Sequence, residues 1–222
     1  MPVDPNAAIE ISAFRWVPDF AAGLVRDLRV RWALEEAGLS YRERLLDATN
    51  PRPADYLREQ PFDQVPIYNE GAISMFETGA IVLHIAERCE VLMPRDPLGR
   101  ARTMSWVLAA LNSVEPFVQQ IASLDIFHVK EEWAKDARGP MLELAKKRLG
   151  RLSHWLGDKD WLEDRFTAGD LMMTTVLRIL RHTDVVAELP NLARYQARCE
   201  ARPAFQHALA DQLAAFRERQ AA

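Results

Sequence analysis

The sequence predicts an α/β domain followed by an all-helical domain. Strand-like and helix-like segments alternate as far as Cys89. The stretch Leu92–Pro97 then places two prolines around charged residues, a composition that is typical of a linker. From Leu98 onward the segments read as helical. We therefore expect one domain over residues 1–93 and a second, all-α domain over residues 98–222.

The first domain is expected to follow the order β-α-β-α-β-β-α. In its first helix, Val30, Leu34 and Ala37 fall at helical spacing, and Gly38 is a stop signal. The expected elements are, in chain order, a strand Ile9–Phe14, a helix Gly23–Ala37, a strand Tyr41–Leu46, a short helix Ala54–Glu59, two short strands around the turn Asn69–Gly71, and a helix from Glu77 to about Cys89.

Two features of the second domain concern helix boundaries. Pro116 is expected to kink or break the first long helix, because proline has no N–H to donate. Thr167 and Asp170 have the spacing of a capping box in its acidic variant. The flanking Phe166 and Leu171 are placed for a hydrophobic staple. This spacing indicates a structural helix start rather than a catalytic site.

Composition and charge exclude several classes of function. The chain of 222 residues carries a net charge of −4, so it lacks the basic footprint of a nucleic-acid-binding protein. No apolar run approaches the length of a membrane span, and residues 1–10 lack the pattern of a signal peptide. Cys89 and Cys199 cannot form a disulfide framework, which favours a cytoplasmic protein. The histidines are scattered, so we expect no metal site.

Residues 65–81 carry the pattern that points to a ligand. A cis bond before Pro66 would leave the backbone N–H and C=O of Val65 free to pair with an extended peptide. Glu77 and Thr78 then open a helix, whose N-terminal N–H groups and dipole attract a carboxylate. Thr78 adds a hydroxyl donor, and Glu77 can hold an ammonium group. The alternative is a plain hairpin followed by an acid-capped helix.

Together with a helix before it and a helical domain after it, this pattern resembles the cytosolic glutathione S-transferase family over nearly the whole chain. In that family a cis-proline follows valine, and an acid–hydroxyl pair opens the next helix. The resemblance implies a thioredoxin-like first domain that binds glutathione through Gln64, Val65, Pro66, Glu77 and Thr78. It also implies that the helical domain forms the pocket for an electrophile, and that the protein is a cytoplasmic homodimer.

The usual activating residue of the family is missing. A free thiol titrates near pH ~8.5, and the bound thiol must be ionised. Family members usually place Tyr, Ser or Cys near the end of the first strand or the start of the first helix. Between Phe14 and Asp27 the sequence has none of these. Phe20 stands near the position of a tyrosine, and Ser12 lies within the strand. The class within the family stays open, and the absence of a local cysteine argues against the thiol-transfer branch.

Arg26 is the candidate that replaces this residue, because a nearby cation and a helix N-terminus both lower the pKa of a thiol. A solvated surface arginine is the alternative, which the neighbouring Arg29 and Arg31 make credible. Trp16 is a candidate wall of the electrophile pocket, or else a core or interface aromatic. Gln64 is either a glutathione contact or a turn residue.

The expected activity is that of a glutathione transferase, a detoxification enzyme that uses glutathione as cosubstrate to attack a small hydrophobic electrophile. Positioning and ionisation of the thiol would supply the catalysis. A glutathione-dependent isomerase or a peroxidase-like reductase stays open as an enzymatic alternative. A non-catalytic binding scaffold of the same fold also stays open, because of the missing Tyr, Ser or Cys.

Overall fold

The structure is a computed structural model that describes residues 3–217 and divides into two compact units. The first unit contains the described residues up to Met93 and those from Arg202 onward. The second unit contains Pro94–Ala201. The division after Met93 falls within the expected linker, whereas the expected second domain continued to residue 222.

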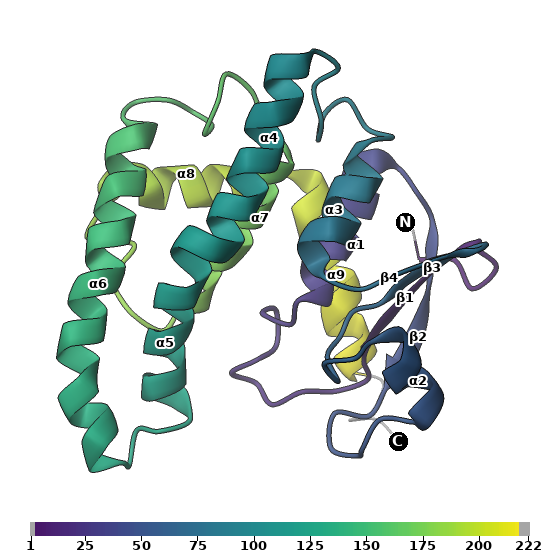
Figure 1. Ribbon diagram of the computed structural model, residues 1–222, viewed down its shortest axis with the longest axis horizontal. Coiled ribbons are helices and arrows are strands. Elements are labelled where there is room, and N and C mark those ends of the chain that lie inside the picture. The colour runs from purple at the N-terminus through teal and green to yellow at the C-terminus, as the bar shows by residue number, and fades with distance from the viewer. Residues whose placement is uncertain (1–2, 218–222) are drawn as a thin grey trace. The chain divides into compact units, whose positions relative to one another are not determined.

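The first unit contains a mixed four-stranded sheet in the order β2-β1-β3-β4 (Figure 1). Strand β1 (Ile9–Phe14) pairs in parallel with β2 (Tyr41–Leu46). On its other side β1 pairs antiparallel with β3 (Tyr68–Glu70), which in turn pairs antiparallel with β4 (Ile73–Met75). The parallel pair is joined by a crossover that contains a helix, as is usual for parallel strands. This sheet confirms the expected thioredoxin-like arrangement.

Three helices complete the predicted element order: α1 (Asp27–Ala37), α2 (Ala54–Glu59) and α3 (Thr78–Ala86). Helix α1 begins at Asp27 and not at the expected Gly23. Gly23 has a φ of 76°, which a right-handed helix does not admit, and residues 19–26 form turns. Gly38 ends the helix as expected, with a φ of 65°.

Helix α9 (Pro203–Arg217) packs against α1 within the first unit (Figure 1). The ring of Trp32 meets that of Phe205 edge-on, with centroids 4.8 Å apart. Arg202 makes two hydrogen bonds to the carboxylate of Glu36, at 2.6 and 2.7 Å. An amphipathic pattern shows that a helix has an apolar face, but it does not show what covers that face. The apolar face of α9 packs against α1, so this last helix belongs to the first unit.

A buried ion pair joins α1 to β2. Arg31 Nε lies 2.6 Å from Asp27 Oδ2, and Arg31 Nη2 lies 2.5 Å from Glu43 Oε1. The guanidinium also donates to the Tyr41 hydroxyl at 3.2 Å. Arg31 is 0% exposed, so it gives no support to the alternative of a solvated surface arginine at the nearby Arg26. A charge buried this deeply is tolerated because each of its partners is fixed beside it.

The second unit is helical, with α7 (Ala168–Leu177) buried along its whole length. Helices α4, α5 and α8 contact α7, and α6 lies against α5 and α8. The bounds of these helices are Pro97–Ala109 for α4, Glu115–Ile126 for α5, Glu132–Leu156 for α6 and Pro190–Glu200 for α8.

A π-helical turn, Ala110–Val114, separates α4 from α5. Pro116 lies in the first turn of α5, where its missing N–H is tolerated. The expected interruption of the first long helix therefore takes the form of a π turn just before the proline.

The start of α7 shows the capping box that the sequence predicted. The N–H of Thr167 donates to Asp170 Oδ2 at 2.9 Å, and Thr167 Oγ1 accepts from the N–H of Gly169 at 3.2 Å. Asp170 Oδ1 also accepts from the N–H of Leu162 at 2.9 Å and from the hydroxyl of Tyr195 at 3.0 Å. One carboxylate thus ties the start of α7 to α8 and to the preceding loop.

We expect Asp170→Ala to lower the free energy of unfolding by more than about 2 kcal/mol, because several buried donors lose their partner. Burial raises the pKa of Asp170 from 3.8 to about 6, although its hydrogen bonds oppose the shift. Between these values the folded chain holds a proton that the unfolded chain has lost. The stability of the native chain should therefore fall as pH rises through this window.

Denaturant unfolding between about pH 4 and pH 7 measures both the loss of stability and the pH slope of the native chain. Asp164→Ala is the control, because Asp164 is an exposed carboxylate in the same loop. The control should keep the native stability and its slope. An Asp170→Ala chain as stable as the native one would contradict this role.

Candidate functional site

Val65, where a peptide-binding edge is expected, lies in the first unit. The bond between Val65 and Pro66 is cis, as expected. The C=O of Gln64 accepts a hydrogen bond from α2, and the N–H of Ile67 donates one to β1. Within residues 3–217, the main chain of Val65 itself makes no hydrogen bond. Its N–H and C=O are therefore available for strand addition by an extended peptide.

Glu77 and Thr78 stand at the start of α3, as the sequence predicted. Glu77 is exposed and has φ 69° and ψ 110°, a combination that is strained for a residue with a side chain. Such residues cluster at binding and catalytic sites, where the surrounding structure holds them in place. Thr78 is the first helical residue and is buried, so its hydroxyl lies at the positive end of the helix dipole.

A buried arginine meets the same helix start. Arg29 Nη1 donates to Thr78 Oγ1 at 3.3 Å, and Arg29 is only 4% exposed. Because Thr78 accepts this bond, its own proton is left to donate to another group. The guanidinium adds a full positive charge to that of the dipole. The helix start is therefore well suited to hold a carboxylate.

The sequence alone did not indicate Arg29, because only Arg26 was singled out in this region. The available signal was its position inside the buried stretch of α1 that runs from Leu28 to Leu34. An arginine at such a position needs a partner in the interior. The identity of that partner depends on the tertiary structure, because Thr78 is far away in the sequence.

The expected thiolate-stabilising region lies between β1 and α1. Arg26 directly precedes α1 and is half-buried, Trp16 is half-buried in the same loop, and Phe20 is exposed. Ser12, the nearest hydroxyl, is fully buried, and its oxygen lies 2.8 Å from that of Tyr56. Because Ser12 is engaged inside the fold, Arg26 and the N–H groups at the start of α1 remain the candidates for stabilising a thiolate.

The segment between β2 and β3 is stabilised by hydrogen bonds among its own residues. Arg52 Nη1 donates to the C=O of Asp47 at 2.6 Å and to that of Asn50 at 2.8 Å. Its guanidinium lies over the ring of Phe14, 4.8 Å from the centroid. Gln64, at the end of this loop, has an exposed side chain that makes no hydrogen bond to the described residues. Gln64 can therefore turn toward a ligand without breaking an internal contact.

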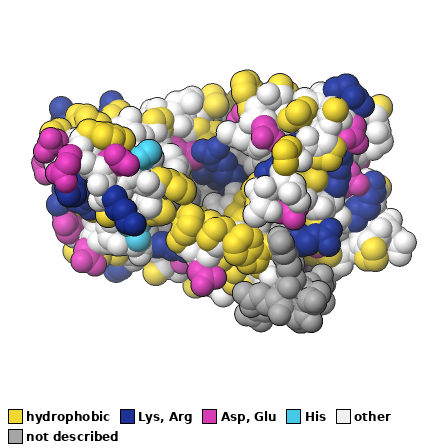
Figure 2. All heavy atoms as spheres, turned by 90° about the horizontal axis from the view of Figure 1, so that it is seen from below, with side chains coloured by type: hydrophobic (Ala, Val, Ile, Leu, Met, Phe, Trp, Pro, Cys, Tyr) yellow, Lys and Arg dark blue, Asp and Glu magenta, His cyan; other side chains and the backbone are white. Residues whose placement is uncertain are grey.

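The described residues contain no metal centre. Within residues 3–217, no group of three or more His, Cys, Asp or Glu side chains is placed to hold an ion. No helix in this part of the chain has the length and apolar character needed to cross a membrane. Figure 2 shows acidic, basic and hydrophobic side chains intermingled on one face of the molecule.

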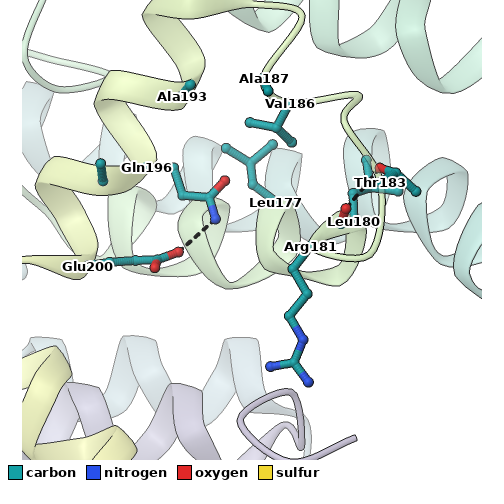
Figure 3. A pocket seen from close by; sticks show the side chains of 10 residues that line it. Leu177, Leu180, Arg181, Thr183, Val186, Ala187, Ala193, Gln196 and Glu200 are labelled. Atoms are coloured by element: carbon teal, nitrogen blue, oxygen red, sulfur yellow. Dashed lines mark hydrogen bonds between the residues drawn. The ribbon is translucent and has the colours of Figure 1, made fainter. Parts of the chain in front are cut away.

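A separate cavity of about 260 Å³ lies in the second unit between α7, the following turn and α8 (Figure 3). Leu177 and Leu180 form part of an apolar wall, and Gln196 donates to Glu200 at 2.6 Å along another side. Arg181 points away from this wall in Figure 3. No cysteine, histidine or tyrosine lines the cavity.

Both parts of the chain match models of one protein family. The glutathione S-transferase N-terminal domain matches residues 21–87, and the C-terminal domain of the same family matches residues 115–203. Glutathione S-transferase F14 from Arabidopsis thaliana is 24% identical over 164 residues, which are 65% of this chain and 62% of the relative. Disulfide-bond oxidoreductase YfcG from Escherichia coli is 27% identical over 144 residues, 58% of this chain and 66% of the relative. Each match spans less than two thirds of the relative's length.

Solved structures share the fold over nearly the whole chain. A glutathione transferase family member from Pseudomonas fluorescens, with two glutathione bound, has a TM-score of 0.80 at 22% identity and covers 92% of this chain and 93% of its own. A glutathione transferase from Pseudomonas putida, with one glutathione disulfide per subunit, has a TM-score of 0.80 at 21% identity, covering 94% and 93%. Likeness at this identity shows the common fold. Taken with the match of both domain models, it shows that this chain belongs to the glutathione S-transferase family.

Proposed function

We propose that the chain binds reduced glutathione in its first unit and ionises the thiol for attack on a small hydrophobic electrophile. The observation that carries this proposal is the strained backbone of Glu77, next to a helix start where Thr78 meets the buried Arg29. A plain acid-capped helix needs neither the strain nor a buried cation. The family membership and the glutathione bound in the Pseudomonas fluorescens structure support the same function.

The helix start would hold the amino-acid end of the peptide. The N–H groups of α3, the Thr78 hydroxyl and Arg29 attract the α-carboxylate, and the Glu77 carboxylate attracts the ammonium group. The main chain of Val65 would pair with the middle of the peptide by strand addition. Gln64 would add a side-chain contact. These groups together restrain the peptide and so place its sulfur.

Thiol ionisation would depend on a positive environment, because the loop between β1 and α1 offers no tyrosine, serine or cysteine. The N–H groups at the start of α1 and the guanidinium of Arg26 would favour the thiolate over the thiol. The proton would leave to solvent, and the thiolate would then attack the electrophile. Trp16 would supply part of the apolar wall against which that electrophile rests.

A second candidate function is reduction of disulfides by glutathione. The Escherichia coli relative is named a disulfide-bond oxidoreductase, and the Pseudomonas putida structure holds a glutathione disulfide. In this reaction one glutathione thiolate attacks a substrate disulfide and releases one thiol. A second glutathione thiolate then attacks the mixed disulfide, so that a second thiol and glutathione disulfide are formed. The reaction needs no cysteine of the protein, which fits the sequence between Phe14 and Asp27.

We further propose that the protein acts as a cytoplasmic homodimer. Phe62 is 64% exposed, and its ring lies 6.1 Å from that of the partly exposed Phe76. An exposed aromatic pair of this kind is characteristic of a surface that another chain covers. Cys89 and Cys199 are not in a disulfide, which fits a reducing compartment.

Replacing Glu77 tests the binding site. Glu77→Ala should abolish saturable glutathione binding in calorimetry, because the partner of the ammonium group is lost. Glu77→Gly should lose binding as well, yet it should be more stable than the alanine variant by about 1–2 kcal/mol, since glycine adopts a positive φ without strain. Glu90→Ala, at an exposed acid beyond α3, is the control and should bind normally. Undiminished binding by Glu77→Ala would exclude this site.

The thiolate can be followed by ultraviolet difference absorbance while reduced glutathione is titrated at several pH values. Saturable binding with thiolate formation well below the free pKa of ~8.5 is the expected result. Arg26→Ala should return thiolate formation toward the free value, whereas Arg15→Ala, at an exposed arginine in the same loop, should not.

Other outcomes of this titration separate the alternatives. Saturable binding with an unshifted thiol would favour disulfide exchange or a non-catalytic scaffold over the transferase reaction. If glutathione does not bind at all, the family membership stands, but the proposed function is wrong.

Sedimentation velocity tests the proposed dimer. The native chain should sediment as a dimer, and Phe62→Ser should shift the equilibrium toward monomer because it removes exposed apolar surface. Phe127→Ser provides a matched control, since Phe127 is 62% exposed at the end of α5. A native chain that sediments as a monomer over the whole concentration range would contradict the proposal.

A further inference from the structure

A chain of hydrogen bonds crosses the interior of the first unit and links three separate segments. The N–H of Ile67 donates to Ser12 Oγ at 2.8 Å, Ser12 Oγ lies 2.8 Å from Tyr56 Oη, and Tyr56 Oη donates to the C=O of Gln64 at 2.6 Å. Ser12 belongs to β1 and Tyr56 to α2, and both residues are 0% exposed. These two side chains with their two main-chain partners are termed the hydroxyl chain below.

The two main-chain groups at the ends of the hydroxyl chain decide which group donates in each of its hydrogen bonds. A carbonyl only accepts, so the single proton of Tyr56 goes to Gln64. The oxygen of Tyr56 must then accept from the hydroxyl of Ser12, whose own oxygen accepts from the N–H of Ile67. All these polar groups are thereby satisfied. Loss of either hydroxyl would leave buried groups without a partner, so neither residue can be replaced by an apolar one without consequence.

The two ends of the hydroxyl chain lie on either side of the peptide-binding edge. They fix the C=O of Gln64 and the N–H of Ile67, while Val65 between them makes no main-chain hydrogen bond within residues 3–217. The C=O of Ile67 also accepts from the N–H of Ser12 at 3.1 Å, so residue 67 is held through both main-chain groups. The backbone conformation around Val65 is therefore fixed before a ligand binds, which reduces the entropic cost of binding.

Tyr56 is itself held firmly. The guanidinium of Arg44 lies over its ring, 5.2 Å from the centroid, and Arg44 Nη1 donates to Glu59 at 2.7 Å. Burial raises the pKa of Tyr56, although Ser12 and nearby arginines oppose the shift. The hydroxyl therefore keeps its proton at neutral pH and remains a donor to Gln64.

We propose that Ser12 and Tyr56 are positioning residues of the glutathione site, which set the main chain of Val65 through the hydroxyl chain. The inference rests on the proposed function and deepens it. Because both side chains are 0% exposed, neither hydroxyl would contact the peptide or its sulfur. Both act on the affinity for the peptide and leave the ionisation of the thiol unchanged.

Two single variants and their combination test this role. Tyr56→Phe and Ser12→Ala should each raise the Kd of glutathione about tenfold, the equivalent of one well-placed hydrogen bond. The Kd of S-methylglutathione should rise equally, because its blocked thiol takes no part. Since both hydroxyls act through one chain, the double variant should bind at most about twofold more weakly than the weaker single variant. The pH of thiolate formation in bound glutathione should not move.

Tyr68→Phe is the matched control. Tyr68 is also 0% exposed, but its hydroxyl donates to Glu70 at 2.8 Å and not to the peptide edge. The control should lose stability without losing affinity. Equal loss of affinity in the control, or independent additive losses in the double variant, would overturn the inference and indicate a general structural effect.

The outcome for the native chain separates this inference from the proposed function. If the native chain binds and Glu77→Ala does not, while Tyr56→Phe stays within about twofold of native affinity, the function stands and the inference is overturned. If the native chain binds no glutathione, both are overturned. Should the variants not fold, amide hydrogen exchange of the native chain decides. Without ligand, the N–H of Ile67 should exchange about a hundredfold more slowly than that of the exposed Gly71, and equal rates would overturn the inference.

Discussion

Helix α1 carries three charged side chains into the interior of the first unit, and each of them pairs with a different element. The three pairs are Asp27 with Gln212 of α9 at 2.7 Å, Arg29 with Thr78 of α3 at 3.3 Å, and Arg31 with Glu43 of β2 at 2.5 Å. Removing one partner of a buried ion pair costs about 3–5 kcal/mol, and a hydrogen bond from a neutral group to a charge contributes about 1.5–3 kcal/mol. The positions of α9, α3 and β2 around α1 are therefore fixed by one requirement, that each buried charge of α1 has a polar partner.

One of these buried charges, Arg29, has its partner in the candidate site. Thr78 is held by this arginine on one side and begins α3 on the other, so the residue before it has little freedom. Glu77 is consequently kept at a φ of 69°, where its carboxylate stands exposed beside the helix start. Strain of this kind persists only where neighbouring contacts over-determine the backbone. The same contacts that stabilise the fold thus place an exposed carboxylate next to the positive end of a helix, the arrangement on which the proposed function depends.

Both units satisfy buried polar groups through short-range motifs and through long-range pairs. In the second unit the capping box of Thr167 and Asp170 satisfies the start of the buried helix α7, and Tyr195 of α8 donates to the same carboxylate. In the first unit Arg31 donates to Asp27 one turn away, and Ser12 of β1 pairs with Tyr56 of α2. Short-range motifs stabilise a helix wherever it lies, whereas long-range pairs fix how elements are arranged. The arrangement of β1, α2 and the segment before β3 depends on the second kind.

The sequence by itself determined the order of elements in the first unit, the bounds of β1 and β2, the capping box before α7, the cis bond before Pro66 and the start of α3. Each of these depends on neighbouring residues, through the alternation of apolar positions, the spacing of a cap or the place of a proline. Only the tertiary structure decided that Arg29 is buried against Thr78, that Ser12 pairs with Tyr56, and that α9 joins the first unit. A local pattern shows that a side chain will be buried, but its partner lies many residues away and is selected only when the chain folds.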